Sequence, residues 1–408
     1  MTELYAGMAR VAITPDHMGF PLMGYGNRKS NSTGVHDPIW ARALVLRKGD
    51  QAWAMCSLDL CYVDAAMVAE IRRRVGAQTG LEPSAVLIST THTHSGPNAN
   101  DAGNWNRPFA ELVAEAIVIA WSNAQPARIA HGAGFLYGHS INRRWFERPV
   151  DPGVGVLRID DTQGNLLGVA VNFALHPVVL GSDSYQVSAD YVGYATTQVE
   201  EELAAICLFT NGGCGDINPL TDTVRRQFAA RDYFTTMARD ARFYGEGPDP
   251  IVIGNRAGGT FEEAEVIGKA LAQEVMYVTQ GLQSQMPAET PWHVQTQVNH
   301  LEDGIEYVET QALGIGDFAL VTQPGEVFAE SALEVKANLR GLGYTYPWLV
   351  SYANDWQLYL APDVAFPEGG YEVNRANERH HSRHLQSRLW QAIEVGITAH
   401  APGTAASA

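Results

Sequence analysis

Short apolar runs alternate with helix-like segments along most of this chain, and this alternation is the feature that most restricts its fold. The runs 41–46 and 52–58 predict two strands joined by a tight turn. Asp64 is a good N-terminal cap and Gly80 a good C-terminal cap for the helix predicted between them. The pattern predicts an α/β fold, in which mixed β-sheets are flanked by helices.

Five of the predicted strands end in polar, titratable or glycine-rich residues. His92 and His94 follow the run that ends at 90, His176 follows the run that ends at 175, and the segment 211–216 follows the run that ends at 209. Glu326 follows the run that ends at 321, and Asn354, Asp355 and Tyr359 follow the run that ends at 350. Binding sites of open α/β sheets form outside the carboxyl ends of strands. We therefore expect a metal site at the C-terminal ends of several strands.

The segment Thr91–Pro97 carries two histidines one residue apart, directly after a predicted strand. On an extended backbone, side chains two residues apart point to the same side, so His92 and His94 are expected to face one region. The two imidazoles could share a metal ion, or one could bind it while the other faces a substrate. Two histidines hydrogen-bonded in a polar loop are the alternative that this motif leaves open.

Three of these strand-end side chains form a set that suits catalytic zinc, which takes about three protein ligands and keeps a position for water. His92, His176 and Glu326 supply two imidazoles and a carboxylate, and a tyrosine phenolate could complete the set. Taken singly, His176 could be a buried structural histidine, and Glu326 could be an acid at the start of a helix predicted to run to Gly341. Taken together, they predict a metal that activates water and polarises a carbonyl group.

Several short motifs, in order along nearly the whole chain, resemble the catalytic domain of the neutral/alkaline (non-lysosomal) ceramidase family. Thr91–Pro97 is identical to the most recognisable motif of that family. The other matching segments are 12–15, 23–26, 34–38, 41–43, 141–143, 173–177, 215–219 and 324–326. Each is short, but their ordered set is specific.

The resemblance implies four zinc ligands, which are His92, His176, Glu326 and Tyr359. Tyr359 ends the segment 354–359, which is similar to the family segment that ends in the ligating tyrosine. The cofactor expected from the resemblance is Zn²⁺, although a set of this kind accepts other divalent metals.

The resemblance also implies four catalytic residues, His94, Arg143, Asn218 and Tyr371. His94 and Arg143 match family residues near the zinc-bound water and the substrate carbonyl, where an arginine can stabilise an oxyanion. Tyr371 belongs to a Tyr-Glu pair that lines the family's site. At Asn218 the family has a serine, and an asparagine cannot be an acyl nucleophile, although its amide can orient a carbonyl. We therefore expect direct attack by zinc-activated water.

The expected activity is zinc-dependent hydrolysis of a linear amide or ester. The family's C-terminal immunoglobulin-like domain and a secretion signal are both missing from the sequence, so we expect one catalytic domain over 1–398, a flexible tail over 399–408, and a cytoplasmic location. For the same reasons we expect a small soluble substrate rather than ceramide. The alternatives are a lipid amidase that cleaves N-acylsphingosine, and a catalytically inactive, zinc-stabilised binding protein.

Composition restricts the partners. The net charge of −17 over 408 residues argues against nucleic acid and against anionic membrane surfaces. No apolar run approaches the length of a membrane span, so no stable membrane insertion is expected. We expect a small-molecule substrate and allow for a homo-oligomer. The four cysteines have no metal-ribbon spacing and are expected to be reduced.

Other motifs are given minor roles. The sequence contains neither His-Glu-x-x-His nor Gly-x-Ser-x-Gly, which disfavours a thermolysin-like site and a nucleophile elbow. A helix is predicted over 377–384, with its histidines His380, His381 and His384 in a solvated basic patch. The glycine-rich segment 254–259 lacks the P-loop lysine and is predicted to be a turn.

Overall fold

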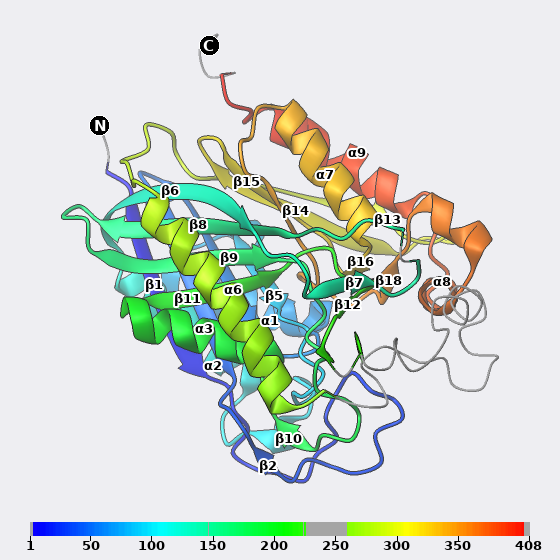
Figure 1. The fold of residues 1–408 in the computed structure, drawn as a ribbon. Coiled ribbons are helices and arrows are strands. Elements are labelled where there is room, and N and C mark those ends of the chain that lie inside the picture. The colour runs from blue at the N-terminus through cyan, green and yellow to red at the C-terminus, as the bar shows by residue number, and fades with distance from the viewer. Residues whose placement is uncertain (1–2, 146, 223, 226–258, 404–408) are drawn as a thin grey trace.

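The computed structural model describes residues 3–145, 147–222, 224–225 and 259–403, and these form four stacked layers. An outer layer of helices covers a large sheet, the large sheet packs against a smaller sheet, and two further helices cover the smaller sheet (Figure 1). The mixed α/β architecture expected from the sequence is confirmed.

The large sheet has eight strands. Its strand order is β11 (Ile206–Asn211), β9 (Leu166–Phe173), β8 (Gly153–Asp161), β6 (Gln125–Phe135), β1 (Tyr5–Ala12), β3 (Trp40–Lys48), β4 (Gln51–Leu58) and β5 (Val86–Thr90). In β3, Ala43 and Val45 face the helices, whereas Leu44 and Leu46 face the smaller sheet. Both faces are therefore buried, which explains why these strands are continuous apolar runs rather than alternating patterns.

Four helices cover the outer face of the large sheet. They are α1 (Ala65–Thr79) and α2 (Phe109–Ser122) over one half, and α3 (Asp190–Leu203) and α6 (Phe261–Gly281) over the other. The predicted caps of α1 are confirmed: Asp64 accepts a hydrogen bond from Met67 N, and Gly80 ends the helix at a φ of 76°. Thr260 and Glu263 form both hydrogen bonds of a capping box at the start of α6.

The smaller sheet has four strands, in the order β13 (Trp292–Asn299), β14 (Tyr307–Ile315), β15 (Phe318–Thr322) and β17 (Trp348–Val350). Leu313, Phe318 and Trp348 pack its inner face against the large sheet. Its outer face is covered by α7 (Ala329–Gly341) and α9 (Leu385–Thr398). Among the described helices, none is long and apolar enough to cross a membrane.

Three strand–helix–strand units have parallel strands, namely β4–α1–β5, β9–α3–β11 and β15–α7–β17. The large sheet curves so strongly that its two edge strands meet, and Asn211 at the end of β11 donates from Nδ2 to Thr91 O just past β5, at 3.0 Å. The carboxyl ends of the three units therefore converge. This is the convergence that the polar strand ends predict.

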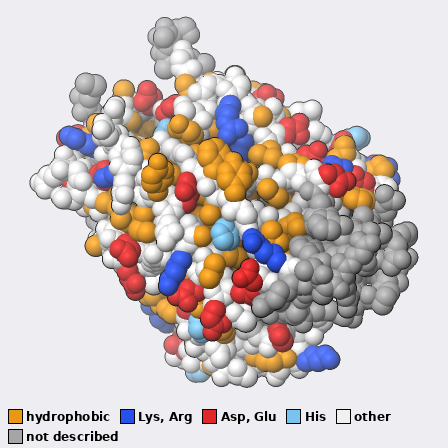
Figure 2. All heavy atoms as spheres, in the orientation of Figure 1, with side chains coloured by type: hydrophobic (Ala, Val, Ile, Leu, Met, Phe, Trp, Pro, Cys, Tyr) orange, Lys and Arg blue, Asp and Glu red, His pale blue; other side chains and the backbone are white. Residues whose placement is uncertain are grey.

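The remaining elements are short. They are the pairs β2 (Gly34–Val35) with β10 (Gln186–Val187), β7 (Ser140–Asn142) with β12 (Ile217–Pro219) and β16 (Glu326–Val327) with β18 (Tyr359–Leu360), the helix α8 (Tyr371–Glu378), and the 3-10 turns 83–85, 102–104 and 363–368. On the face of the molecule seen in Figure 2, acidic and basic side chains are interspersed around a central group of apolar side chains.

Two helix predictions need correction. The helix predicted from Glu326 begins at Ala329, because Glu326 pairs with β18 as part of a short strand. The helix predicted over 377–384 is wrong: α8 ends at Glu378, and His380 has a positive φ of 54°. His381 is buried against His300 rather than solvated, whereas His384 is exposed.

Two further predictions concern the ends of the described segments. The turn predicted over 254–259 lies outside the described residues except for Gly259. The last helix ends at Thr398, and beyond it His400 stacks on Trp292 and Ala401 is buried.

Candidate active site

Two histidines and one glutamate meet where the strand ends converge. Nε2 of His176 lies 3.1 Å from Glu326 Oε2, and Nε2 of His92 lies 3.7 Å from the same oxygen. One nitrogen or oxygen atom from each side chain lies within 4.8 Å of the other two. All three side chains are buried, with at most 4% of each residue exposed.

The two histidines are fixed in one tautomer by backbone carbonyls. His92 Nδ1 lies 2.7 Å from Cys61 O, and His176 Nδ1 lies 2.6 Å from Cys214 O. A carbonyl oxygen only accepts, so each Nδ1 carries the hydrogen and each Nε2 keeps its lone pair. Burial lowers the pKa of both rings to about 3, so both are neutral.

The chemistry of this cluster fits a bound divalent cation. The two Nε2 lone pairs face a carboxylate whose Oε2 is buried and makes no hydrogen bond within the described part of the chain. Three converging acceptors are unfavourable in a dry interior unless a cation lies between them. Two imidazole nitrogens held through Nδ1 by carbonyls, together with one carboxylate, are a donor set typical of zinc.

The backbone at His92 differs from the extended conformation expected from the sequence. Its φ is 68°, because the chain turns sharply after β5 and His92 N donates to Leu60 O at 2.9 Å. The His92 ring stacks on Tyr352, with centroids 4.0 Å apart, and makes an angle of 78° with the His94 ring. The two rings thus share a region as predicted, but through a left-handed turn.

Tyr359 lies beside the cluster because β18 pairs with β16, which places it opposite Glu326 in the ladder. Its hydroxyl accepts a hydrogen bond from Arg143 Nη2 at 2.8 Å. Burial raises the pKa of Tyr359 well above its ordinary value, and the Arg143 charge opposes this shift. Tyr359 is therefore a buried phenol beside the carboxylate.

The Arg143 guanidinium connects the remaining polar groups. Besides Tyr359, it donates from Nε to Glu372 Oε1 at 2.8 Å and from Nη1 to Asn218 Oδ1 at 3.1 Å. Asn218 is held opposite Ile141 by the β7–β12 pair. Three partners fix the plane of the guanidinium, so its position is set before any substrate arrives.

His94 and Tyr371 lie on opposite sides of this network. His94 Nε2 is 3.1 Å from His92 Nε2, and its ring meets the edge of Tyr25 at a centroid distance of 4.7 Å. A Cβ at Gly24 would lie 2.2 Å from His94 Cγ, so only glycine leaves room for this ring. Tyr371 begins α8, and its ring lies 5.5 Å from that of Tyr359.

The structure thus brings together all eight residues that the sequence singled out. Sequence reasoning missed the role of Tyr352, which stacks on His92 and has a positive φ of 54°. It noted Glu372 only as a neighbour of Tyr371, whereas that carboxylate pairs with both Arg143 and Arg144. The Tyr-Glu pair was the available signal for Glu372, and no local pattern distinguishes Tyr352.

A second group of potential ligands overlaps the first and consists of Cys61, His92 and His94. Cys61 approaches His92 on the side of Nδ1, which already donates to Cys61 O. Burial also raises the pKa of the Cys61 thiol well above its ordinary value, which disfavours the thiolate that a metal needs. The favoured ligand set is therefore His92, His176 and Glu326.

Comparisons with known proteins agree on one family. Residues 5–288 match the family model described as neutral/alkaline non-lysosomal ceramidase, N-terminal. The chain is 25% identical over 244 residues to the neutral ceramidase of Pseudomonas aeruginosa, an alignment that covers 52% of this chain and 36% of that protein. It is 27% identical over 289 residues to neutral ceramidase B of Dictyostelium discoideum, covering 60% and 39%. The alignments therefore span less than half the length of these relatives.

The fold comparison extends over almost the whole chain. The crystal structure of the Pseudomonas aeruginosa neutral ceramidase superimposes with a TM-score of 0.78 and 17% sequence identity, covering 98% of this chain and 75% of that one. At this level of identity the match establishes the shared fold. It also extends past residue 288, where the family model stops.

Proposed function

The chain belongs to the neutral/alkaline non-lysosomal ceramidase family, and from this premise we propose that it is a metal-dependent hydrolase of N-acyl amides. The observation that supports the proposal is the buried set of three acceptors, in which Glu326 Oε2 faces the Nε2 atoms of His92 and His176. We propose these three residues and Tyr359 as ligands, with zinc as the metal. We also propose that residues 1–398 act as one catalytic unit.

For the substrate, we propose a lipid amide of the ceramide type. The sequence suggested a small soluble substrate, but the relatives that match this chain are named neutral ceramidases. Asn218 is the remaining argument for a different substrate, and it concerns the nucleophile more than the acyl chain. The comparisons therefore favour the lipid amidase over the small-substrate enzyme.

A divalent metal bound at this cluster would supply Lewis acidity, which polarises a carbonyl and makes water more acidic. The side chains around it have separate tasks. Arg143 is oriented to donate hydrogen bonds to the substrate carbonyl oxygen as negative charge develops there. Asn218 keeps Arg143 in place and offers a polar amide, not a nucleophile, to the same region.

We assign proton transfer to His94. Burial lowers the pKa of this imidazole well below its ordinary value, so the ring is neutral and one of its nitrogens carries a lone pair. In the proposed reaction the oxygen of water attacks the carbonyl carbon while His94 takes the proton that water loses. The carbon–nitrogen bond then breaks, and His94 returns the proton to the departing amine. A carboxylic acid and an amine are released.

The test combines metal analysis with a substrate panel. We expect about one zinc per chain, and loss of hydrolysis of a fluorescent N-acylsphingosine after chelation, with recovery on adding zinc. His92→Ala should remove the metal, whereas Asn218→Ala should keep it and lower turnover alone. If Asn218→Ala also lost the metal, the proposed role of Asn218 would be wrong.

The panel also separates the alternatives. It contains N-acylsphingosine, a short soluble N-acyl amide and an ester of the same acyl group. Faster cleavage of the short amide would restore the small-substrate hypothesis. Zinc-loaded protein that cleaves none of the three would favour a zinc-stabilised binding protein.

A further inference from the structure

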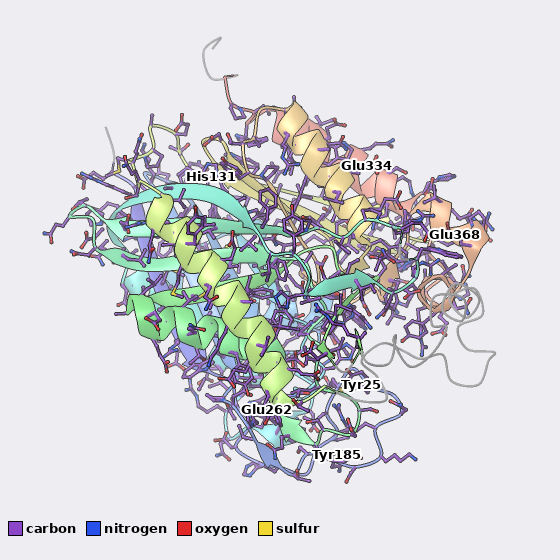
Figure 3. All side chains as sticks on the ribbon, in the orientation of Figure 1. Tyr25, His131, Tyr185, Glu262, Glu334 and Glu368 are labelled. Carbon is purple, nitrogen blue, oxygen red and sulfur yellow. The ribbon has the colours of Figure 1, made fainter. Side chains whose placement is uncertain are left out.

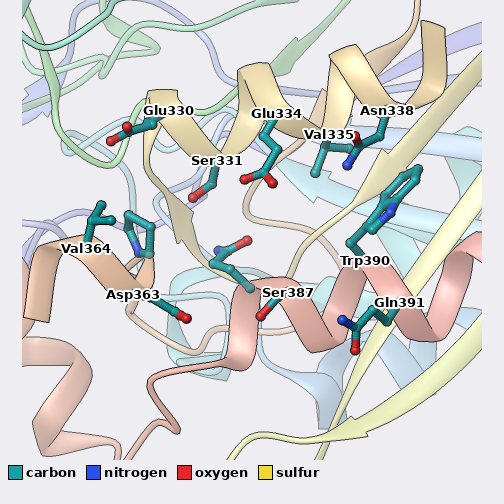
Figure 4. A pocket seen from close by; sticks show the side chains of 12 residues that line it. Glu330, Ser331, Glu334, Val335, Asn338, Asp363, Val364, Ser387, Trp390 and Gln391 are labelled. Carbon is teal, nitrogen blue, oxygen red and sulfur yellow. The ribbon is translucent and has the colours of Figure 1, made fainter. Parts of the chain in front are cut away.

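A groove of about 360 Å³ lies between α7, α9 and the turn at 363–368, and none of the residues that line it belongs to the proposed active site. Figure 4 shows side chains of both helices pointing into it, among them Ser331 and Glu334 from α7 and Trp390 from α9. In Figure 3, Glu334 on α7 lies far from Tyr25, the residue that contacts His94. The groove is thus a separate feature.

The floor of the groove offers unused hydrogen-bond acceptors. Ser331 is only 4% exposed, and no group in the described part of the chain hydrogen-bonds its hydroxyl, which points into the groove. Gln386 is 9% exposed and donates from Nε2 to Leu360 O at 3.0 Å, which leaves its Oε1 as an acceptor. The Ser331 residue is nearly buried but its hydroxyl opens into the groove, where a ligand or water can hydrogen-bond to it.

The rim carries three carboxylates, of which one is unpaired. Glu330 pairs with Arg148, and Asp363 pairs with His384. Glu334 makes no ion pair with any residue that the structure describes, and it projects toward the space above Ser331. The groove therefore has an uncompensated negative charge directly above a buried hydroxyl.

The remaining walls combine apolar side chains with the polar side chains of Asn338, Ser387 and Gln391. Val335 and Val364 line the groove, and the Trp390 ring is half-buried with one part facing the groove. An indole face beside a carboxylate attracts cations that also have hydrocarbon to bury. A strongly hydrated inorganic ion would gain nothing from these walls.

We propose that this groove binds an organic ammonium ion with an apolar body. Its nitrogen would lie between the Glu334 carboxylate, the Ser331 hydroxyl and Gln386 Oε1, and its hydrocarbon would pack against Trp390 and Val335. Such an ion satisfies the buried hydroxyl, the free carboxylate and the exposed aromatic face together. This proposal does not depend on the hydrolase assignment, because it concerns binding at a different place.

The test uses phenethylammonium and its neutral analogue 2-phenylethanol, titrated calorimetrically into the full-length protein at low salt. We expect measurable binding of the cation and at least about tenfold weaker binding of the alcohol, because a charge-assisted hydrogen bond is lost. Glu334→Gln should weaken cation binding by about tenfold. Glu394→Gln, on α9 outside the groove, makes the same charge change and should leave binding unaltered.

A second variant tests the aromatic wall. Trp390→Leu keeps an apolar side chain but removes the indole, and we expect about fivefold weaker cation binding with little effect on 2-phenylethanol. Equal affinities for the cation and the alcohol, equal effects of Glu334→Gln and Glu394→Gln, or no binding of phenethylammonium to the unmodified protein would each overturn the proposal.

Discussion

The buried cluster and the surface groove both gather acceptors, but they do so at different depths. At the cluster, two imidazole nitrogens and the Glu326 carboxylate converge with at most 4% exposure, so bulk solvent barely reaches their lone pairs. At the groove, the Glu334 carboxylate stays open to solvent and only the floor is buried. The degree of burial therefore determines which cation each site suits. A buried set of lone pairs suits a metal ion, whereas a partly solvent-exposed carboxylate beside an aromatic ring suits an organic cation.

The largest expected effect comes from Glu326→Gln. Metal affinity should fall by more than about 100-fold, since loss of residues that only support ligands already costs 10–100-fold. Without metal, the variant should be more stable than the unmodified protein by about 1 kcal/mol, because an amide can donate to the histidine lone pairs. Metal titration and urea unfolding of metal-free samples measure the two effects.

Glu378→Gln is the matched control for this experiment, since Glu378 is exposed and its one ion pair within the described residues is with Arg375. Glu378→Gln should change neither the metal affinity nor the free energy of unfolding of the metal-free protein. If the metal-free Glu326→Gln protein were clearly less stable than the parent, the three acceptors would not need a cation. The cluster would then no longer differ from the groove in the kind of cation that it suits.

Arg143→Lys should have the next largest effect. A lysine cannot reach Tyr359, Asn218 and Glu372 together, so we expect turnover to fall by about 100-fold while the metal content is unchanged. The measurement is kcat on the best substrate of the panel, together with zinc analysis. Unchanged turnover would remove Arg143 from the proposed chemistry and leave it a structural role.

Asp190 provides a third carboxylate for the comparison, since it is buried like Glu326 but has hydrogen-bond donors at both oxygens. Oδ2 accepts from Leu180 N at 2.9 Å, and Oδ1 accepts from Tyr191 N at 2.7 Å. Burial nevertheless raises its pKa from 3.8 to about 7. The folded protein thus binds the proton more tightly than the unfolded chain between these two values.

Ionisation of Asp190 should lower the free energy of unfolding as the pH rises. The contribution of Asp190 to the free energy of unfolding is complete below pH 3.8 and is lost as the pH rises toward about 7. The slope is at most about 1.4 kcal/mol per pH unit. Urea unfolding at pH 5 and pH 7.5 should show this loss in the parent and a smaller one in Asp190→Asn. Identical pH dependence in both proteins would contradict the assignment.

The smallest effect concerns salt. Raising sodium chloride from about 0.05 M to about 0.5 M should weaken phenethylammonium binding a few-fold, because the Glu334 charge is screened by solvent ions. Binding of 2-phenylethanol should not weaken, which provides the control in the same titration. Salt-independent binding of the cation would place its nitrogen away from Glu334.

Much of this architecture follows from local sequence. The caps of α1 at Asp64 and Gly80, the capping box of α6 and the turn between β3 and β4 depend on neighbouring residues alone, and all are present. The helix predicted over 377–384 failed because tertiary packing buries His381 against His300, a contact that no local pattern reveals. Local rules succeed where the interactions that fix the backbone are themselves local.

Reading the amino-acid sequence is enough to list the ligand atoms of this protein and to place them after strand ends. How those atoms are used depends on tertiary contacts. The carbonyls that fix the tautomers of His92 and His176 come from Cys61 and Cys214, which are 31 and 38 residues away along the chain. The curvature of the large sheet, the left-handed turn at His92 and the packing of α7 beside α9 likewise arise from contacts between distant segments. Donor types are a property of composition and order, whereas lone-pair direction and burial depend on the complete packed fold.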